Sequence, residues 1–338
     1  MQRRGAGAWE RVAHTGLPPG RAEGGVNLLH VHAVQDATNT QAYIPAVETF
    51  LREARQRGWC LDTAEHCDRA LADMLAVLCY AWCVGIQQGR YLVAGFQHIY
   101  PEYDGKLPEA ERALKAWERF GTVSERDPIC VEAWAAVLVA FLRCGDPEGA
   151  LITALSFDCL FRGQDWFQLQ VADVSSSHTS QGALEVAIAL GVRSRGESVK
   201  TGFNQGVVVE RLWIARWLLA FRERRIVSGA RVLFSVTRDE FRTRFQAHQQ
   251  RLGIDLGPPH ILRHGGAAEM IAQKQHPNTV KRRGRWVTDS SLRRYTKTHV
   301  LIAQRASLPS AVLDLGRLFL ADPVNELHRA HFNVLDPR

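Results

Sequence analysis

The sequence predicts a mainly α-helical protein with a small antiparallel β-sheet, an α+β fold divided into two domains. Apolar residues recur at helical spacing from Tyr43 to Leu160. After Arg162 the pattern changes to three short strand-like stretches, and helical spacing then returns as far as Leu320. With 338 residues the chain exceeds one typical domain, so two domains with tails are expected.

The first 122 residues divide into a leader and a helical domain. Residues 1–40 are rich in Gly, Pro, Asn and Thr and show no sustained period, which predicts a flexible leader. Residues 41–122 predict a helical N-terminal domain. Its first helix is expected over Ala46–Gly58, because a glycine ends an apolar stretch there. Asp62 and Glu65 are spaced like a capping box and are expected to open a long apolar helix.

Two further helices and a domain boundary follow along the chain. Pro108 is expected to begin one helix and Gly121 to end it. The polar stretches around this helix predict a domain boundary near Val123. Beyond the boundary, Val131–Cys144 predicts another helix, and Pro147 suits the first position of the next one.

The second domain, residues 123–307, is predicted to hold the sheet and most of the remaining helices. The predicted strands are Trp166–Val174, Ala183–Leu190 and Gly206–Val209. The predicted helices are Glu210–Arg225, Arg238–Leu252 and further helical segments up to about Ala306. Residues 308–338 form a C-terminal tail, in which the apolar stretch Leu308–Leu320 predicts a separate helix.

The charge distribution indicates a polyanionic partner. The net charge of the chain is +7. Between Gly191 and Val300 the sequence holds 22 Lys and Arg against 8 Asp and Glu, a net charge of +14, so the remainder carries −7. A basic block inside a neutral-to-acidic chain is typical of proteins that bind nucleic acid. The alternative is an arginine-rich surface that serves solubility alone.

Cysteine usage and hydropathy indicate a protein of a reducing compartment. The seven cysteines are odd in number and form no C-x-x-C pair, which favours buried free thiols. Cys79 and Cys83 are four residues apart, but no nearby histidine completes a metal site. No apolar run reaches about 18 residues and the N-terminus lacks an apolar core, so neither a membrane span nor a signal peptide is expected. The protein is expected in the cytoplasm of a prokaryote or the nucleus of a eukaryote.

Six residues in the second half of the chain form a chemically coherent set. Their motifs are Pro259-His-Ile-Leu-Arg-His-Gly-Gly-Ala267, Arg283-Gly-Arg-Trp286 and Arg293-Arg-Tyr-Thr-Lys297. His260 and Arg263 are three residues apart and share nearly one helix face. The full set is Arg162, Lys200, His260, Arg263, Trp286 and Tyr295.

These residue types suit attack on a DNA phosphodiester without a metal or another cofactor. The pentacoordinate transition state places extra negative charge on the non-bridging oxygens, which the guanidinium forks of Arg162 and Arg263 match. The indole N–H of Trp286 supplies one more donor. Tyr295 is the candidate nucleophile, because a phenolic oxygen is also a fair leaving group and its phosphoryl link is reversible.

Proton transfer falls to two further residues. Because the ordinary pKa of tyrosine is about 10, Tyr295 needs help to lose its proton. His260 and the cationic surroundings are expected to assist this deprotonation. The departing 5′ oxygen needs an acid, for which Lys200, predicted on a loop between two strands, is the candidate. Arg193 and Arg195 lie near it in the sequence as alternatives for this cationic position.

The ordered motifs resemble the C-terminal signature of the tyrosine recombinases, the phage-integrase family. Upstream, Phe161-Arg-Gly-Gln-Asp165 with Leu169 and Asp173 is similar to the first arginine box of that family, and Val199-Lys-Thr201 stands where the family has its hairpin lysine. The resemblance covers about Val123 to Ala306. Asp165 stands where Glu is usual and could still brace Arg162, and Trp286 replaces the more frequent His, as in some members.

The resemblance implies a site-specific recombinase or integrase that cleaves and rejoins double-stranded DNA through a 3′-phosphotyrosyl intermediate. It implies no metal, no ATP and four protomers on two DNA sites, with no role for a membrane. By position and helix content, residues 41–122 then correspond to a core-binding DNA domain. The helix at Leu308–Leu320 would dock on a neighbouring protomer, or alternatively pack on its own domain.

Several residues also have simpler explanations when they are taken singly. Arg162 could be a salt-bridge partner of Asp165. His260 and His264 are spaced as zinc ligands, although no glutamate lies between them and no third ligand follows. Trp286 could be a core aromatic and Tyr295 a half-buried surface residue. The run Lys281-Arg282-Arg283 suits either nuclear targeting or phosphate contacts.

Two other functions stay open from the sequence. The stretch from Ala267 to Trp286 resembles a helix-turn-helix, which favours a non-catalytic DNA-binding protein derived from a mobile element. A type IB topoisomerase-like enzyme, which nicks one strand, uses similar chemistry. That family has His where Trp286 stands, and this chain has a distinct N-terminal helical region. Target sequence and direction of recombination cannot be read from the motifs.

Overall fold

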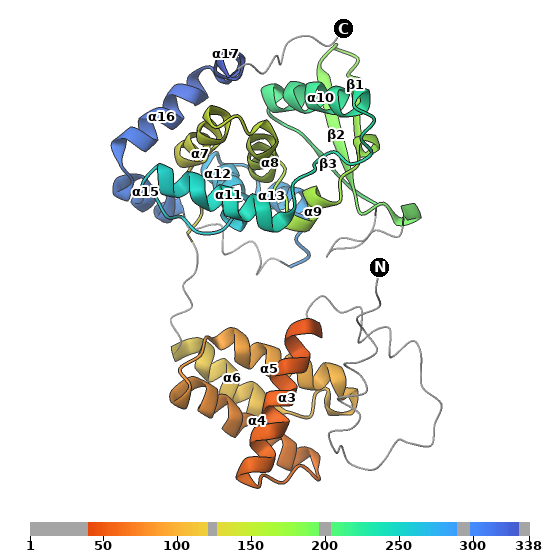
Figure 1. The fold of residues 1–338 in the computed structure, drawn as a ribbon, viewed down its shortest axis with the longest axis vertical. Coiled ribbons are helices and arrows are strands. Elements are labelled where there is room, and N and C mark those ends of the chain that lie inside the picture. The colour runs from red at the N-terminus through yellow and green to blue at the C-terminus, as the bar shows by residue number, and fades with distance from the viewer. Residues whose placement is uncertain (1–39, 121–126, 196–203, 289–297, 331–338) are drawn as a thin grey trace. The chain divides into compact units, whose positions relative to one another are not determined.

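The computed structural model describes residues 40–120, 127–195, 204–288 and 298–330. The chain divides into two compact units, unit 1 at Met1–Ser124 and unit 2 at Glu125–Arg338 (Figure 1). Each unit has its own apolar core. Among the described residues, no helix is long and apolar enough to cross a membrane.

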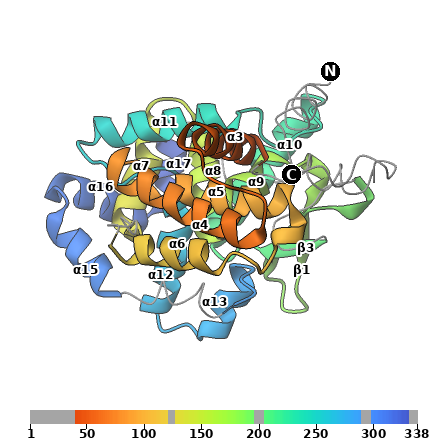
Figure 2. The same cartoon turned by 90° about the horizontal axis from the view of Figure 1, so that it is seen from below.

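Unit 1 is entirely helical in its described part. Its elements are α3 (Thr40–Arg57), α4 (Ala64–Ala76), the π-helix η1 (Val77–Ala81), α5 (Ile86–Ile99), the 3₁₀-helix η2 (Pro101–Tyr103) and α6 (Pro108–Phe120). Helix α3 packs on α5 and α4 packs on α6 (Figures 1 and 2). Phe50, Leu71 and Leu75 are buried between them, which explains why their apolar faces repeat at helical spacing.

The start of α4 differs from the sequence prediction. Its N-cap is Thr63, whose side chain accepts a hydrogen bond from the His66 N–H at 3.2 Å, and not Asp62. The Asp62 carboxylate instead lies 3.1 Å from Sγ of Cys60. A hydroxyl directly before the first helical residue reaches the free N–H groups of the first turn, so Thr63 displaces its neighbour as the cap. The predicted helix from Pro108 is confirmed as α6.

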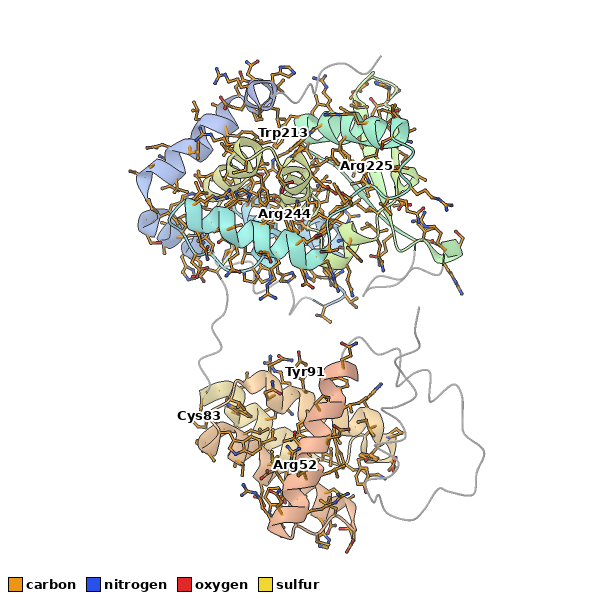
Figure 3. All side chains as sticks on the ribbon, in the orientation of Figure 1. Arg52, Cys83, Tyr91, Trp213, Arg225 and Arg244 are labelled. Atoms are coloured by element: carbon orange, nitrogen blue, oxygen red, sulfur yellow. The ribbon has the colours of Figure 1, made fainter. Side chains whose placement is uncertain are left out.

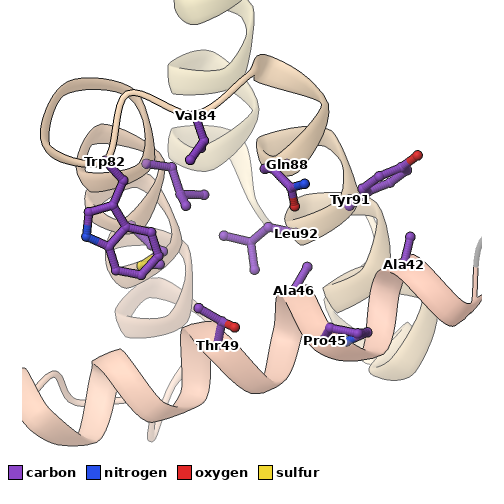
Figure 4. A pocket seen from close by; sticks show the side chains of 11 residues that line it. Ala42, Pro45, Ala46, Thr49, Trp82, Val84, Gln88, Tyr91 and Leu92 are labelled. Carbon is purple, nitrogen blue, oxygen red and sulfur yellow. The ribbon is translucent and has the colours of Figure 1, made fainter.

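A mainly apolar pocket lies between α3, α5 and the end of η1 (Figure 4). Its volume is about 360 Å³, and Pro45, Trp82 and Tyr91 are among the residues that line it. No Asp, Glu, Lys, Arg or His takes part in this lining.

Unit 2 is a helical domain with one small sheet. Its elements up to the sheet are α7 (Val131–Arg143), α8 (Pro147–Asp158), α9 (Gly163–Phe167), η3 (Val171–Asp173), β1 (Val174–His178), β2 (Leu184–Leu190), η4 (Arg193–Arg195) and β3 (Gln205–Val208). The later elements are α10 (Leu212–Val227), α11 (Arg238–Arg251), α12 (His260–Ala272), α13 (Pro277–Arg283), α15 (Thr298–Ser307), α16 (Ser310–Ala321) and α17 (Pro323–Arg329). The predicted α+β class, mainly helical with a small antiparallel sheet, is confirmed.

The sheet is a three-stranded antiparallel meander in the order β1-β2-β3. Val174 pairs with Ile188 across β1 and β2, and Leu190 pairs with Gln205 across β2 and β3. The second and third predicted strands are therefore confirmed, with small shifts at their ends.

The first predicted strand, Trp166–Val174, is wrong over most of its length. The Asp165 carboxylate accepts the N–H of Arg162, and the Asp173 carboxylate accepts the N–H of Gln170, each at 2.8 Å. These two capping boxes close the helical turns α9 and η3, so a continuous strand begins only at Val174, and Gln170 between them forms an isolated antiparallel bridge with Val232.

Helices α7 and α8 form the centre of unit 2, with α16 on one side and α10 and the sheet on the other (Figure 1). Helix α12 packs on both central helices because it carries two adjacent glycines. A Cβ at Gly265 would lie 2.3 Å from the Ile129 carbonyl oxygen, and one at Gly266 would lie 2.0 Å from that of Phe157. The Gly-Gly pair after His264 therefore permits direct backbone contact.

The C-terminal helix α16 packs along α7 of its own unit. Val312, Leu313 and Phe319 are buried there, and a Cβ at Gly316 would lie 1.9 Å from the Glu132 carbonyl oxygen. This packing matches the alternative that the sequence left open for Leu308–Leu320. The apolar face that was expected to dock on a neighbouring protomer is already covered within the chain.

Candidate functional site

Four of the six predicted site residues lie in described parts of unit 2. Arg162 is the N-cap of α9, His260 is the first residue of α12, Arg263 is one turn further along, and Trp286 follows the end of α13. The other two, Lys200 and Tyr295, lie outside the described residues. In the sequence Lys200 falls between β2 and β3, and Tyr295 falls three residues before α15.

Arg263 is fixed by backbone carbonyls and by an aromatic ring. Its side chain is 1% exposed. Nη1 donates to the carbonyl oxygen of Leu160 and Nη2 to that of Gly284. The guanidinium carbon lies 4.6 Å from the centroid of the Trp286 ring, a cation–π contact. Arg263 on α12 and Trp286 after the end of α13, both predicted as site residues, are thus in contact.

Gly284 allows Trp286 to reach this position. A Cβ at residue 284 would lie 2.1 Å from the Trp286 ring, so only glycine permits the indole to fold back over the end of α13. The ring also packs against the small apolar cluster of Leu160, Ala267, Met270 and Val280. Gly284 therefore has a packing role within the Arg283-Gly-Arg-Trp286 motif.

Arg285 is a site residue that sequence reasoning missed. It is 9% exposed, and its Nη2 donates to the Asp165 carboxylate and, at 3.2 Å, to the Leu160 carbonyl oxygen. Burial lowers the pKa of the Arg285 guanidinium, Asp165 opposes this shift and the neighbouring charge of Arg162 adds to it. A signal was present, because Arg285 stands inside the Gly-Arg-Trp motif and Asp165 inside the first arginine box.

The role predicted for Asp165 is therefore corrected. Its carboxylate accepts the backbone N–H of Arg162 and pairs with the side chain of Arg285, so the alternative of a salt bridge between Asp165 and the Arg162 guanidinium is not formed. Asp165 is 2% exposed, and an aspartate at the third position of α9 is the right length to cap the helix. Asp165 therefore fixes the position of Arg162 by accepting its backbone N–H.

Two non-glycine residues of the site have left-handed backbone conformations. Leu160 has φ 52° and Arg285 has φ 53°. Such a conformation costs roughly 1–2 kcal/mol for a residue with a Cβ. The Leu160 carbonyl oxygen accepts from both Arg263 and Arg285, and its side chain is fully buried. Packing and hydrogen bonds offset the strain, so the carbonyl and Arg285 stay in place.

The charges of the site do not balance within the described residues. The guanidinium of Arg285 pairs with the Asp165 carboxylate, lies within the electrostatic influence of Arg162, and shares the Leu160 carbonyl oxygen with Arg263. Nη1 of Arg162 and both Nε and Nη1 of Arg285 are buried without a hydrogen-bond partner in the described part of the chain. Buried donors of this kind are costly unless they meet an acceptor. An oxyanion with several acceptor oxygens suits them.

His260 lies at the edge of this site and is exposed. Its ring packs edge-to-face on that of His264, with 4.7 Å between centroids. Within the described ranges, no group of three or more His, Cys, Asp and Glu is placed to hold a metal ion. The histidine pair is thus arranged as an aromatic contact on the first turn of α12.

Two neighbouring arginines have internal roles. Arg283 donates to the Asp158 carbonyl oxygen at 2.9 and 2.7 Å, to its carboxylate at 3.1 Å and to the Val208 carbonyl oxygen at 3.0 Å. These bonds tie α13 to α8 and β3, so a phosphate contact by Arg283 is not supported. Arg195 pairs with buried Asp173 at 2.8 Å, which gives this alternative to Lys200 a structural partner.

No protein-family model matches the chain, and no curated protein matches it. Among solved structures, the chain is similar to one described as the crystal structure of XerA recombinase, with 14% sequence identity and a TM-score of 0.40. That similarity covers 79% of this chain and 90% of the other. We therefore infer function from the residues of the site.

Proposed function

We propose that this chain is a tyrosine-type DNA strand transferase, a site-specific recombinase that works through a 3′-phosphotyrosyl intermediate. One observation carries the proposal. In the described part of the chain, Nη1 of Arg162 and Nε and Nη1 of Arg285 are buried donors without a partner, and Arg285 shares the Leu160 carbonyl oxygen with Arg263. A phosphodiester supplies the anionic oxygens that such donors require.

The arginines bind the scissile phosphate and stabilise the transition state. Arg162 presents its guanidinium from the N-terminus of α9, and Arg263 is held rigidly from α12. Arg285 adds positive charge while its pairing with Asp165 keeps it in position. Because these groups are fixed before the reaction, little reorganisation is needed as negative charge grows on the phosphoryl oxygens. Trp286 stacks on Arg263, and its indole N–H suits a further phosphate oxygen.

Tyr295 is the proposed nucleophile. Its phenolic oxygen forms a bond to phosphorus, the bond from phosphorus to the 5′ oxygen breaks, and a 5′-hydroxyl leaves. His260 takes part in removing the phenolic proton, and Lys200 donates a proton to the leaving oxygen. A 5′-hydroxyl from another strand then attacks the phosphotyrosine and restores the backbone. The energy of the broken bond is kept in the covalent link, so the reaction needs neither ATP nor a metal.

Basic residues of unit 2 fit the proposed partner, double-stranded DNA. Arg216, Lys274 and Arg282 are among the exposed basic side chains of this unit. Recombination between two DNA sites implies that four protomers act together, as the sequence resemblance suggests. Helix α16 is packed on its own unit, so protomer contacts through another surface are part of this proposal.

The decisive experiment is trapping of a covalent protein–DNA adduct. The protein is incubated with a library of nicked suicide duplexes, in which the 5′-hydroxyl product diffuses away after cleavage. We expect a denaturation-resistant adduct with the wild type and a loss of at least about a thousandfold with Tyr295→Phe, because the nucleophilic oxygen is gone.

A matched control uses Tyr91→Phe, since Tyr91 lies in unit 1 (Figure 3) and should leave the adduct unchanged. DNA binding without an adduct in the wild type would favour the non-catalytic DNA-binding protein. Relaxation of supercoiled DNA without strand exchange would favour the topoisomerase-like enzyme.

A further inference from the structure

A second pocket adjoins the candidate site. It lies between the junction of α8 with α9, the first turns of α11 and the Pro258-Pro259-His260 turn, and its volume is about 410 Å³. Phe161 and Gly163, the neighbours of Arg162 in the chain, both line it, as does His260. A ligand in this pocket would therefore lie beside the phosphate held by Arg162 and Arg263.

Aromatic rings of the packed core back this pocket. Phe161, Trp166 and Phe241 line it and are 2%, 3% and 1% exposed, so each belongs mainly to the core and offers little ring surface to a ligand. Pro258 and Pro259 form part of the lining, and their fixed φ angles restrict movement of that side. The lining is both polar and apolar, and the volume is in the range of about 300–1,000 Å³ typical of ligand sites, which suits a group with polar edges such as a nucleobase.

The rim of the pocket is polar and mainly cationic. Arg238 and Arg242 are four residues apart on α11 and so share one helix face. Arg242 is exposed and has no hydrogen-bond or ion-pair partner in the part of the chain that the structure describes. Asp239 also lines the pocket, so acceptor and donor groups converge on it. Guanidinium and carboxylate groups match the donor and acceptor edges of a nucleobase and its phosphate.

We propose that this pocket receives one unstacked nucleotide of the bound DNA, next to the phosphate that Arg162 and Arg263 hold. The inference rests on the proposed function insofar as DNA is the ligand. In an intact duplex the bases are stacked and paired, so this pocket can receive a base only after it leaves the stack. Unstacking costs about a few kcal/mol, which polar contacts of the base with Asp239 and the two arginines offset. Arg242 and Arg238 neutralise the phosphate of that nucleotide.

The chain offers variants that separate this pocket from the phosphate site. Gly163→Leu fills the pocket, since a Cβ at Gly163 meets only Cδ of Arg238 at 3.6 Å. Arg242→Ala removes one rim charge. The matched control is Arg244→Ala on the same helix (Figure 3), because Arg244 pairs with Asp146 at 3.2 Å and does not line the pocket.

The test uses the full-length protein and a duplex selected by binding from a random library. 2-Aminopurine replaces each base in turn, since its fluorescence rises when it leaves the stack. We expect a severalfold rise at one position with the wild type and with Arg244→Ala. A mismatch at that position should raise wild-type affinity about tenfold, because the base is already partly unstacked. Gly163→Leu should abolish both effects, and Arg242→Ala should weaken them.

The outcomes distinguish this inference from the proposed function. Wild-type binding with no fluorescence change at any position overturns the pocket proposal, as does a mismatch preference that persists in Gly163→Leu. A fluorescence change without a covalent adduct overturns the recombinase proposal and leaves the nucleotide pocket standing. Failure to bind any duplex overturns both.

Discussion

Within their described residues, unit 1 and unit 2 differ in how completely their buried charged side chains are hydrogen-bonded. In unit 1 the buried charged residue is Asp68, and its two carboxylate oxygens accept the N–H groups of Glu109 and Ala110, each at 2.8 Å. This carboxylate caps the start of α6 and is fully satisfied by the backbone. In unit 2 buried Arg285 pairs with Asp165, yet two of its nitrogens have no described partner. A buried charged group whose oxygens or nitrogens all have backbone partners has a structural role. A buried charged group whose N–H donors have no described partner points to a ligand.

The distribution of charge follows the same division. Residues 41–122 contain 9 Lys and Arg against 11 Asp and Glu, whereas residues 191–300 contain 22 against 8. The pocket of unit 1 has no charged lining residue, whereas that of unit 2 has two arginines and an aspartate. Unit 2 should therefore supply most of the salt-dependent affinity for DNA, although the sequence resemblance assigns DNA binding to residues 41–122 as well.

Of the changes predicted to affect one unit and not the other, truncation after Ser307 should have the largest effect on stability. It removes α16, whose Val312, Leu313 and Phe319 are buried in the core of unit 2. Each such side chain contributes roughly 1.5–3 kcal/mol, and the total stability of a domain is about 5–15 kcal/mol. In calorimetry of the truncated chain, we expect the unfolding transition of unit 2 to be lost or its midpoint temperature to be strongly lowered. The transition of unit 1 should be unchanged.

The control for this truncation is Leu318→Ser. Leu318 is 58% exposed on the outer side of α16, so its replacement should leave unit 2 stable. If the truncated chain keeps its unit 2 transition and loses only assembly on DNA, then α16 is a docking element, and its packing on α7 contributes little.

Replacement of buried aspartates should give the next largest effect. Asp165→Ala leaves Arg285 buried without its carboxylate, which costs about 3–5 kcal/mol. Asp68→Ala removes two hydrogen bonds to a charged acceptor in unit 1 and should cost less, roughly 1.5–3 kcal/mol. Urea unfolding, followed separately for each unit, measures both values.

A double variant sharpens this comparison. Asp165→Ala with Arg285→Leu removes both members of the pair, so part of the stability lost in Asp165→Ala should return. DNA affinity should stay low in the double variant, because Arg285 is then absent from the anion site. Full recovery of both stability and DNA affinity would remove Arg285 from the proposed function.

The smallest expected effect is a dependence of unit 2 stability on mild acid. Burial lowers the pKa of His248, Arg251 lowers it further and Asp146 opposes the shift. The ring lies 4.1 Å from that of Phe141. The unfolded chain therefore takes up the proton at a higher pH than the folded chain does. Stability is present at neutral pH and falls as the pH drops through the unfolded value of about 6.5.

This pH dependence can be assigned by substitution. His248→Phe should flatten the change in the unit 2 unfolding free energy between about pH 7.5 and pH 5.5, as measured by urea titration at each pH. The transition of unit 1 in the same molecule serves as the reference. An unchanged slope in His248→Phe would assign the pH dependence to other groups.

The sequence predicted the helices of both units well where apolar spacing and terminal residues agreed. Pro108 begins α6, and the stretch from Val131 forms α7 as expected. The first predicted strand failed because Trp166 to Val174 is rich in apolar residues, a pattern shared by buried strands and short buried helices. The side chains of Asp165 and Asp173 decided between them by capping helical turns.

The candidate site was predicted in part. Motif spacing predicted His260, Arg263 and Trp286 as site residues, and the structure brings Arg263 against Trp286. Arg285 was missed, and Asp165 was given the wrong partner, because a pairing across 120 residues leaves no periodic signal in the sequence. The places of Lys200 and Tyr295 in the site stay predictions, since both lie outside the described residues.

The amino-acid sequence by itself determined the local features of this protein: many of its helices, its mainly helical class with a small sheet and its order of basic and aromatic motifs. These features depend on neighbouring residues and on short-range spacing. Only the tertiary structure decided that the Leu160 carbonyl holds two arginines, that Asp165 pairs with Arg285, and that α16 covers α7. Those choices depend on burial, because desolvated donors and apolar faces take whichever partner the packed core brings within reach.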